Sequence, residues 1–354
     1  MRGLLPALFA ALMIGALSAG QAGAACSGLY VFGDSLSDTG NVNLLFGNDP
    51  LQVVASNDYV PDLPYAAGQF TNGDVWVWPF AAAEGLSSYA GPVLGSSGAF
   101  SRLGDFAFGG ATTAVDGSVA LPAVPLFTAY PPSLRSQVTV YISHLAAAGK
   151  SAPGDALFVL AGGGNDGLDG LDAIANGANE ASTIETVANR FAAVTQSMVD
   201  DLHAAGARTV VVWNVPDFGL LPLFSGADAS TRALATRMAQ RMNNALRARL
   251  EGEPGVIRYD LFGEMRTVVA NPSTFGLSNA SDACGNALAG CAPSAALFWD
   301  AIHPTQAGHA IIAHTMHAAV HAVTEAHARG SESCAASAED LAAAQRLTPA
   351  LGGR

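Results

Sequence analysis

Short apolar runs alternate along this chain with longer alanine-rich stretches. The runs that combine aliphatic, β-branched and aromatic residues are 28–32, 106–108, 156–160, 209–213 and 256–259. The stretches with apolar residues at helical spacing are 133–148, 183–205, 229–250 and 304–329. Strands that alternate with helices are typical of βαβ units, in which helices cover both faces of a parallel sheet. The chain is therefore predicted to be an α/β protein whose functional residues follow the carboxyl ends of the strands.

The composition supports a large buried core and argues against a nucleic-acid partner. Half of the 354 residues are hydrophobic, and the net charge is −13. A net negative chain without a basic patch repels phosphate backbones. Beyond the first 25 residues no apolar segment is long enough for a transmembrane domain, so none is expected.

The first 25 residues differ from the rest of the chain. Arg2 precedes an almost wholly apolar run, 4–17, and small residues follow, with an A-x-A-like site at 22–24. This layout predicts a secretory signal peptide over 1–25 and a secreted or periplasmic protein. A retained anchor is one alternative. A lipoprotein modified at Cys26 is another, although Gly23 stands where such a site usually has leucine.

The four cysteines fit an exported protein, because an even number there predicts disulfides. Cys284 and Cys291 bracket a short loop rich in glycine and alanine and are the expected pair. Cys26 and Cys334 would then join the two ends of the domain. No C-x-x-C pair occurs, so no structural zinc site is expected from the cysteines.

Two segments depart from the strand-and-helix alternation. Residues 41–105 are rich in glycine, proline and aromatic residues, with one helix expected near 75–83, and residues 116–132 carry four prolines. Long ordered loops are often binding loops or lids. Residues 331–354 are rich in small residues and are expected to form a C-terminal tail.

A candidate nucleophile follows the first predicted strand. Ser35 lies in the stretch Phe-Gly-Asp-Ser-Leu-Ser-Asp-Thr-Gly-Asn over 32–41 and is expected to open a helix. A serine nucleophile needs a base, and a histidine base needs an orienting carboxylate. Asp300 and His303 offer both within one loop, three residues apart. A tetrahedral intermediate also needs hydrogen-bond donors for its oxyanion. Gly110, after the second strand, and the Asn165 amide, after the third, can supply them together with the Ser35 N–H.

Four separated blocks carry a resemblance to a known family. They are Gly-Asp-Ser-Leu at 33–36, Gly-Gly-Ala-Thr at 109–112, Gly-Gly-Asn-Asp at 163–166 and Asp-Ala-Ile-His-Pro at 300–304. In this order they resemble the SGNH hydrolases, also called GDSL esterases and lipases. The longer match through 38–41 resembles the larger lipase-like and phospholipase-like members.

The resemblance implies a fold, a domain and a set of roles. The fold would be a three-layer α/β/α arrangement with a parallel, flavodoxin-like five-stranded sheet, within a hydrolase domain over 26–330. Ser35 would be the nucleophile, His303 the base and Asp300 its partner. Gly110, with Gly109 as the alternative, and Asn165 would be the oxyanion donors. No cofactor and no metal are implied.

The substrate is expected to be a small-molecule or lipid ester, cleaved through an acyl-enzyme by a carboxylesterase or lipase. Three alternatives stay open. A phospholipase or acyltransferase would use the same residues, as would a carbohydrate acetylesterase. A non-catalytic protein of the same fold would bind a lipid or a glycan.

Three other patterns have two interpretations each. Gly162, Gly164 and Gly167 fit G-x-G-x-x-G, but Asp166 would occupy the phosphate position of a dinucleotide site. The pair of tryptophans at 76 and 78 could line an acyl pocket, although core packing is the stronger interpretation. The histidines at 317 and 321 are four apart on a predicted helix and could share a metal, although a solvated helix face is more common.

Overall fold

A computed structural model describes residues 26–46, 68–95, 104–121, 126–285 and 291–327. The predicted signal peptide over 1–25 and the predicted tail over 331–354 lie outside these residues. Among the described residues, no helix combines the length and apolarity needed to cross a membrane.

The centre of the molecule is a parallel sheet, as the alternation predicts. Its four strands, in the order β1-β4-β5-β6, are β1 Leu29–Gly33, β4 Leu157–Ala161, β5 Thr209–Trp213 and β6 Val256–Tyr259. All residues of β1, β4 and β5 are buried. Burial on both faces is the reason that these strands are continuous apolar runs rather than alternating ones.

The predicted strand over 106–108, the second in chain order, is not a continuous strand: the segment 104–108 lies along the outer edge of β1 and pairs with it through a single bridge at Asp105. Val31 N–H donates to the Gly104 carbonyl at 2.8 Å, and Phe106 N–H donates back to the Val31 carbonyl at 2.8 Å. Phe108 N–H then bonds the Gly33 carbonyl at 3.2 Å. The segment 104–108 therefore takes the edge position next to β1, where a flavodoxin-like order places the second strand of the chain.

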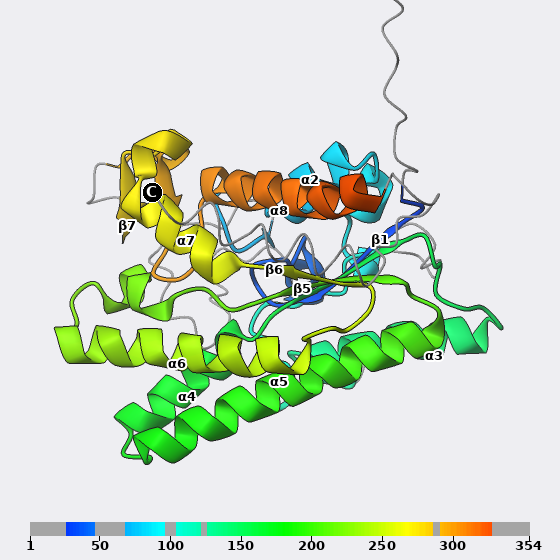
Figure 1. Cartoon of the computed structure of the whole chain (residues 1–354), viewed down its shortest axis with the longest axis horizontal. Coiled ribbons are helices and arrows are strands. Elements are labelled where there is room, and N and C mark those ends of the chain that lie inside the picture. Colours follow the sequence, from blue (N-terminus) through cyan, green and yellow to red (C-terminus); the bar gives the residue numbers. More distant parts are fainter. Residues whose placement is uncertain (1–25, 47–67, 96–103, 122–125, 286–290, 328–354) are drawn as a thin grey trace, which may run out of the picture.

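Helices cover both faces of the sheet (Figure 1). One layer contains α3 Leu134–Ala147, α4 Gly164–Ala175, α5 Glu180–Ala205 and α6 Ala229–Arg249. The opposite layer contains α2 Val77–Ala83 and α8 Gln306–His327. The strands divide their side chains between two cores: Tyr30 and Phe32 face one core, whereas Leu29 and Val31 face the other. The predicted three-layer α/β/α fold is confirmed.

The remaining elements are short. The helices are α1 Asn41–Phe46 and α7 Leu261–Ala270, with 3-10 turns η2 Ser87–Tyr89, η3 Val93–Gly95, η4 Phe218–Leu220, η5 Pro222–Phe224, η6 Pro272–Phe275 and η8 Pro293–Ala295. Two small sheets pair β2 Val119–Ala120 with β3 Ala129–Tyr130, and β7 Asn279–Ala283 with β8 Ala296–Phe298.

Two boundary predictions next to the candidate site are wrong. Ser35 does not open a helix: it lies in a turn, and α1 begins only at Asn41. The helix expected from residue 304 begins at Gln306, because Pro304 forms an antiparallel bridge with Phe298.

The structure contains a disulfide between Cys284 and Cys291, whose Cα atoms are 5.3 Å apart. Cys26 is also disulfide-bonded. Its expected partner, Cys334, lies outside the described residues.

Candidate active site

Ser35 lies at the carboxyl end of β1, in a turn that the strand and its neighbours hold tightly. The Ser37 and Asp38 N–H groups both donate to the Asp34 carbonyl at 3.0 Å, so residues 34–38 form a tight turn that contains Ser35. Gly33, just before the turn, leaves no room for a side chain, since a Cβ would lie 2.7 Å from the Ala161 carbonyl. The Ser35 hydroxyl is therefore presented from a rigid support at the edge where parallel sheets place their sites.

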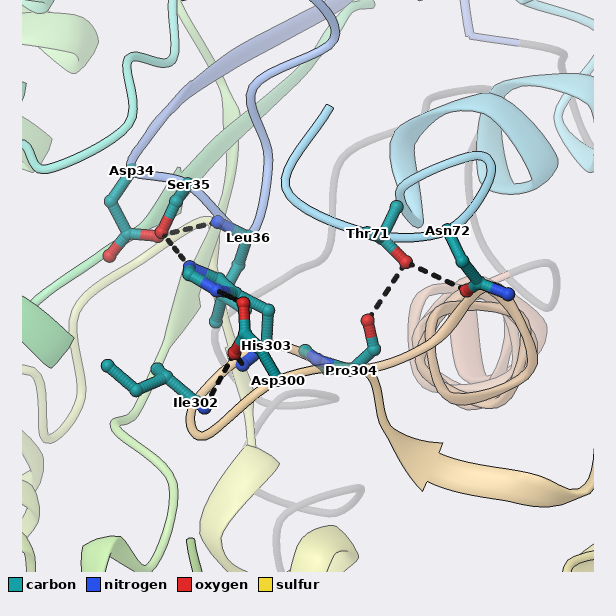
Figure 2. A network of polar contacts seen from close by, with 9 residues as sticks. All are labelled: Asp34, Ser35, Leu36, Thr71, Asn72, Asp300, Ile302, His303 and Pro304. Atoms are coloured by element: carbon teal, nitrogen blue, oxygen red, sulfur yellow. Dashed lines mark hydrogen bonds and ion pairs between the residues drawn. The ribbon is translucent and has the colours of Figure 1, made fainter. Parts of the chain in front are cut away.

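The structure brings Ser35, His303 and Asp300 into one hydrogen-bonded line (Figure 2). His303 Nε2 is 2.7 Å from Ser35 Oγ, and His303 Nδ1 is 2.7 Å from Asp300 Oδ2. All three side chains are buried, Ser35 with 8% of its surface exposed and the other two with 2% or less. This geometry suits a serine whose proton passes to an oriented imidazole.

Asp300 is kept ionised in spite of its burial. Burial by itself raises the pKa of this carboxyl, but attraction to His303 and hydrogen bonds hold it below its usual value. The bonds come from the His303 ring and from the backbone N–H groups of Ile302 and His303, which donate to Oδ1 at 2.7 and 2.6 Å. An ionised Asp300 both orients the ring and stabilises an imidazolium.

The loop that carries His303 is fastened at several points. Trp299 N–H donates to the His303 carbonyl at 2.8 Å. The Thr71 hydroxyl donates to the Pro304 carbonyl at 2.9 Å, so the segment before α2 supports this loop (Figure 2). The Phe70 ring packs against the imidazole with centroids 5.5 Å apart.

Residues 109–113, here called the glycine loop, contain both candidates for the backbone oxyanion donor. The Gly109 N–H is already used, because it donates to Asp38 Oδ2 at 3.0 Å. Gly110 has a positive φ of +81°, and within the described part of the chain no acceptor contacts its N–H. The geometry therefore favours Gly110 over Gly109 as the donor.

Asn165 is the second residue of α4, not a loop residue. Gly163, with a φ of +106°, makes the tight turn between β4 and this helix. The Asn165 amide lines the same pocket as Ser35 and donates one hydrogen to the Ala111 carbonyl at 2.8 Å. An amide nitrogen carries two hydrogens, so one stays available for a substrate oxygen.

Two buried carboxylates hold the glycine loop from opposite ends, and neither was predicted from the sequence. Asp38 accepts from Gly109 as described, and also from Gly40 and Asn41 N–H at 2.8 and 2.6 Å. Burial raises the pKa of Asp38 to about 6, against the opposing effect of these N–H groups. At the other end Asp166 accepts from Thr113 N–H at 2.8 Å and from the Thr113 hydroxyl at 2.9 Å.

The segment 38–41, which follows Ser35, also bonds a third buried carboxylate, that of Asp105. Asp105 Oδ2 accepts from the Thr39 N–H at 2.8 Å and from the Thr39 hydroxyl at 2.5 Å. The Asn41 amide donates to the carbonyls of Asp105 and Ala107 at 3.0 and 2.9 Å. Burial, reinforced by the negative charge of Asp38, raises the pKa of Asp105 well above its usual value. The longer motif over 38–41 is the sequence feature from which these contacts could have been predicted.

Gln137 of α3 was also missed. Its fully buried amide accepts from the Gly33 N–H at 2.9 Å and donates to the Gly33 carbonyl at 2.9 Å and the Pro132 carbonyl at 3.0 Å. The side chain thus bonds the backbone of the last β1 residue, two positions before Ser35.

An apolar pocket extends from Ser35. Its walls include Leu36, Leu168, Phe218, Leu261, Met265 and Ile302. A polar side chain also lines it: Glu264, whose carboxyl bonds the Tyr259 and Thr315 hydroxyls and whose pKa is raised by burial to about 7. The pocket suits an aliphatic group attached to the carbonyl that Ser35 would attack.

The tryptophan and glycine patterns have structural explanations. Trp76 is fully buried against Trp213, with ring centroids 4.9 Å apart, and its indole N–H donates to Ser37 Oγ at 3.0 Å. Neither it nor Trp78 lines the pocket. Gly167 lies within α4, where a Cβ would come 2.3 Å from the Phe218 ring, so this glycine permits close packing.

Comparisons with known proteins point to one family. The family model of the GDSL-like lipases/acylhydrolases matches residues 29–316. The GDSL esterase/lipase EXL6 of Arabidopsis thaliana is 26% identical over 83% of this chain and 91% of that protein. Esterase EstA of Pseudomonas aeruginosa is 28% identical, and an uncharacterized protein in the trpE-trpG intergenic region of Pseudomonas putida is 30% identical, over 81% and 84% of this chain. The chain spans 46% and 50% of the lengths of these two bacterial relatives.

Proposed function

The chain belongs to the GDSL-like lipase/acylhydrolase family, and on that premise we propose that it is a serine hydrolase of carboxylic esters that works through an acyl-enzyme. The observation that carries the proposal is the line of two 2.7 Å contacts from Ser35 through His303 to Asp300. The esterase names of similar proteins support the reaction class.

In the proposed first half-reaction, Ser35 Oγ attacks the ester carbonyl while His303 Nε2 takes its proton. Asp300 keeps the ring in the tautomer that leaves Nε2 free to accept. The oxyanion would be held by the N–H groups of Gly110 and Ser35 and by the second hydrogen of the Asn165 amide. One such donor typically contributes a factor of about 10²–10³ in kcat.

The two products leave in succession, the alcohol at the end of the first half-reaction and the carboxylic acid in the second. The imidazolium of His303 protonates the leaving alcohol as the tetrahedral intermediate collapses to an acyl-Ser35 ester. Water then attacks this ester, with His303 again as the base, and the carboxylic acid leaves.

The pocket supports an aliphatic acyl group. Since its walls are mainly aliphatic and aromatic, each buried methylene of a bound acyl chain should contribute roughly 0.8 kcal/mol to binding. We therefore propose an esterase or lipase for esters longer than acetate, in preference to a carbohydrate acetylesterase. A rate series on p-nitrophenyl esters from acetate to laurate would test this, and a maximum at acetate would contradict it.

The nucleophile is tested by replacing Ser35. Ser35→Ala should lower kcat/KM on a p-nitrophenyl ester by several orders of magnitude and abolish labelling by a fluorophosphonate probe. Ser88→Ala, at an exposed serine outside the pocket, is the matched control and should keep both. Parent-like hydrolysis by a folded Ser35→Ala protein would end the proposal. A parent protein that folds but does not react with the probe would favour the non-catalytic binding protein.

We also propose that the protein is exported after removal of residues 1–25. The disulfides support an oxidising compartment. The disulfide at Cys26 also favours this over a lipoprotein, because a thiol cannot be both lipid-modified and disulfide-bonded. Mass spectrometry of the protein from a bacterial host should give an unmodified mature chain that begins near Cys26. A retained leader or a lipid adduct would contradict it.

A further inference from the structure

A second cluster of chemically active side chains joins α2 to α8, on the layer opposite α5 and α6. Glu84 caps the carboxyl end of α2, and its two oxygens face two histidines of α8. Glu84 Oε1 is 2.8 Å from His317 Nδ1, and Glu84 Oε2 is 3.2 Å from His321 Nε2.

The helix geometry brings the two imidazoles to one place. His317 and His321 are four residues apart, so they lie on the same face of α8, and their ring centroids are 4.3 Å apart. One atom from each of the three side chains lies within 4.8 Å of the other two. Two nitrogens and one carboxylate oxygen therefore lie close enough to share one ion after side-chain adjustment.

The buried carboxylate of Glu84 favours a bound cation in this cluster. Only 6% of the Glu84 side chain is exposed, and among the described residues its ion-pair partners are these two histidines alone. A carboxylate that has lost most of its water needs a positive partner. A divalent transition metal would supply one, and imidazole nitrogens are good ligands for such an ion.

We propose that Glu84, His317 and His321 form a three-ligand site for a divalent transition metal, zinc in the first instance. Zn²⁺ binds imidazole nitrogen at about 2.0–2.1 Å and carboxylate oxygen at about 2.0–2.2 Å, so neighbouring ligand atoms in a tetrahedral shell lie about 3.3 Å apart. The contacts of 2.8 and 3.2 Å run to different oxygens of Glu84, so side-chain rotations must bring one oxygen and the two nitrogens from within 4.8 Å of one another to this spacing.

The exposure of the histidines leaves the outer side of the site accessible. The His317 and His321 side chains are 35% and 47% exposed, so a metal can enter from solvent and water can complete its shell. His317 lies about 16 Å along the helix from its first residue, Gln306, by the rise of an α-helix, and so away from His303. The metal would therefore act by cross-linking α2 to α8, not in ester cleavage.

The test is titration of the untagged full chain with Zn²⁺ by calorimetry, with Co²⁺ as a spectroscopic probe. The parent should bind one Zn²⁺ saturably and show the visible absorption of a nitrogen- and oxygen-ligated Co²⁺. His317→Ala and His321→Ala should each weaken binding by at least roughly 10–100-fold, because each removes one of three ligands. Zn²⁺ should raise the thermal midpoint of the parent and not that of these variants.

The matched control is His314→Ala, at an exposed histidine of the same helix outside the cluster. It should bind Zn²⁺ within about twofold of the parent. Glu84→Gln should weaken binding as the histidine variants do. If Glu84→Gln fails to fold, the two histidine variants, which keep parent ester hydrolysis, still decide the question. No saturable binding by the parent, or equal losses in the control and the cluster variants, would overturn the proposal.

Discussion

Replacing Gln137 with methionine should destabilise the protein by about 2 kcal/mol. Methionine fills nearly the same volume but makes none of the three hydrogen bonds that the Gln137 amide makes to Gly33 and Pro132. The Gly33 carbonyl keeps a partner in Phe108 N–H, so the Gly33 N–H and the Pro132 carbonyl lose theirs. Each buried group without a partner costs about 1–3 kcal/mol. A buried thioether avoids the desolvation cost of a buried amide, which returns roughly 1–3 kcal/mol. The difference is the net destabilisation of about 2 kcal/mol.

A second substitution at this site should make stability depend on pH. In Gln137→Glu one carboxylate oxygen can still accept from Gly33 N–H, but the other faces the two carbonyls that the amide now bonds. Only the protonated acid can donate there, so its native pKa should lie above the unfolded value of about 4.3. The sign follows from linkage: the native state then binds more protons between these two pKa values. Stability is therefore fully present below pH 4 and is lost as the pH rises through the native pKa.

The assay is urea unfolding followed by far-ultraviolet circular dichroism at several pH values. Gln240→Met, at an exposed position on α6, is the control and should change the free energy of unfolding by less than about 0.5 kcal/mol. Because Gly33 lies two residues before Ser35, Gln137→Met should also slow fluorophosphonate labelling of the folded protein. If Gln137→Met unfolds within 0.5 kcal/mol of the parent, the argument from unpaired buried groups is wrong.

Three further predictions concern other parts of the fold. Asp166→Ala removes both hydrogen bonds to Thr113 and should lower kcat on p-nitrophenyl esters about 10–100-fold with little change in KM, since the glycine loop loses its position; a larger change in KM than in kcat would refute this role. His309 is buried with neither ring nitrogen bonded among the described residues, and burial lowers its pKa to about 3. The parent should thus lose stability as the pH falls from 6.5 towards 3, and His309→Leu should flatten this loss in acid unfolding curves. Replacing Cys284 and Cys291 together by serine opens a link of seven residues and should cost about 2 kcal/mol in urea unfolding, measured without reducing agent so that the Cys26 disulfide stays intact.

Strands β1, β4 and β5 were readable from the sequence because they are buried on both faces and are therefore almost wholly apolar. One helix next to the site was not. The α4 sequence has glycines at 164, 167 and 170, which lower helix propensity. In the structure these glycines allow close packing: a Cβ on Gly170 would lie 2.9 Å from Met238 and Val187. Tertiary packing stabilises this helix, and local helix propensity takes no account of such contacts.

The residues of the candidate site, too, fall into those that the sequence predicts and those that it does not. Ser35, Asp300 and His303 could be proposed because each lies in a short motif whose residues suit one reaction. The supporting contacts join positions far apart, such as Gln137 to Gly33 across 104 residues. A single sequence carries no sign of such pairs, since a buried glutamine in a helix looks like any other polar helix residue.

The contact between Ser35 and His303 closes a loop of 268 residues. For a flexible chain this closure would cost about 5 kcal/mol of entropy, far more than one hydrogen bond near 1 kcal/mol returns. The sheet and its helices must therefore form before the two side chains meet. Since the proposed nucleophile is made early in synthesis and its proposed base near the end, a nascent or truncated chain would hold Ser35 without His303 and would be inert. Esterase activity would then measure how many chains in a sample have been completed and fully folded.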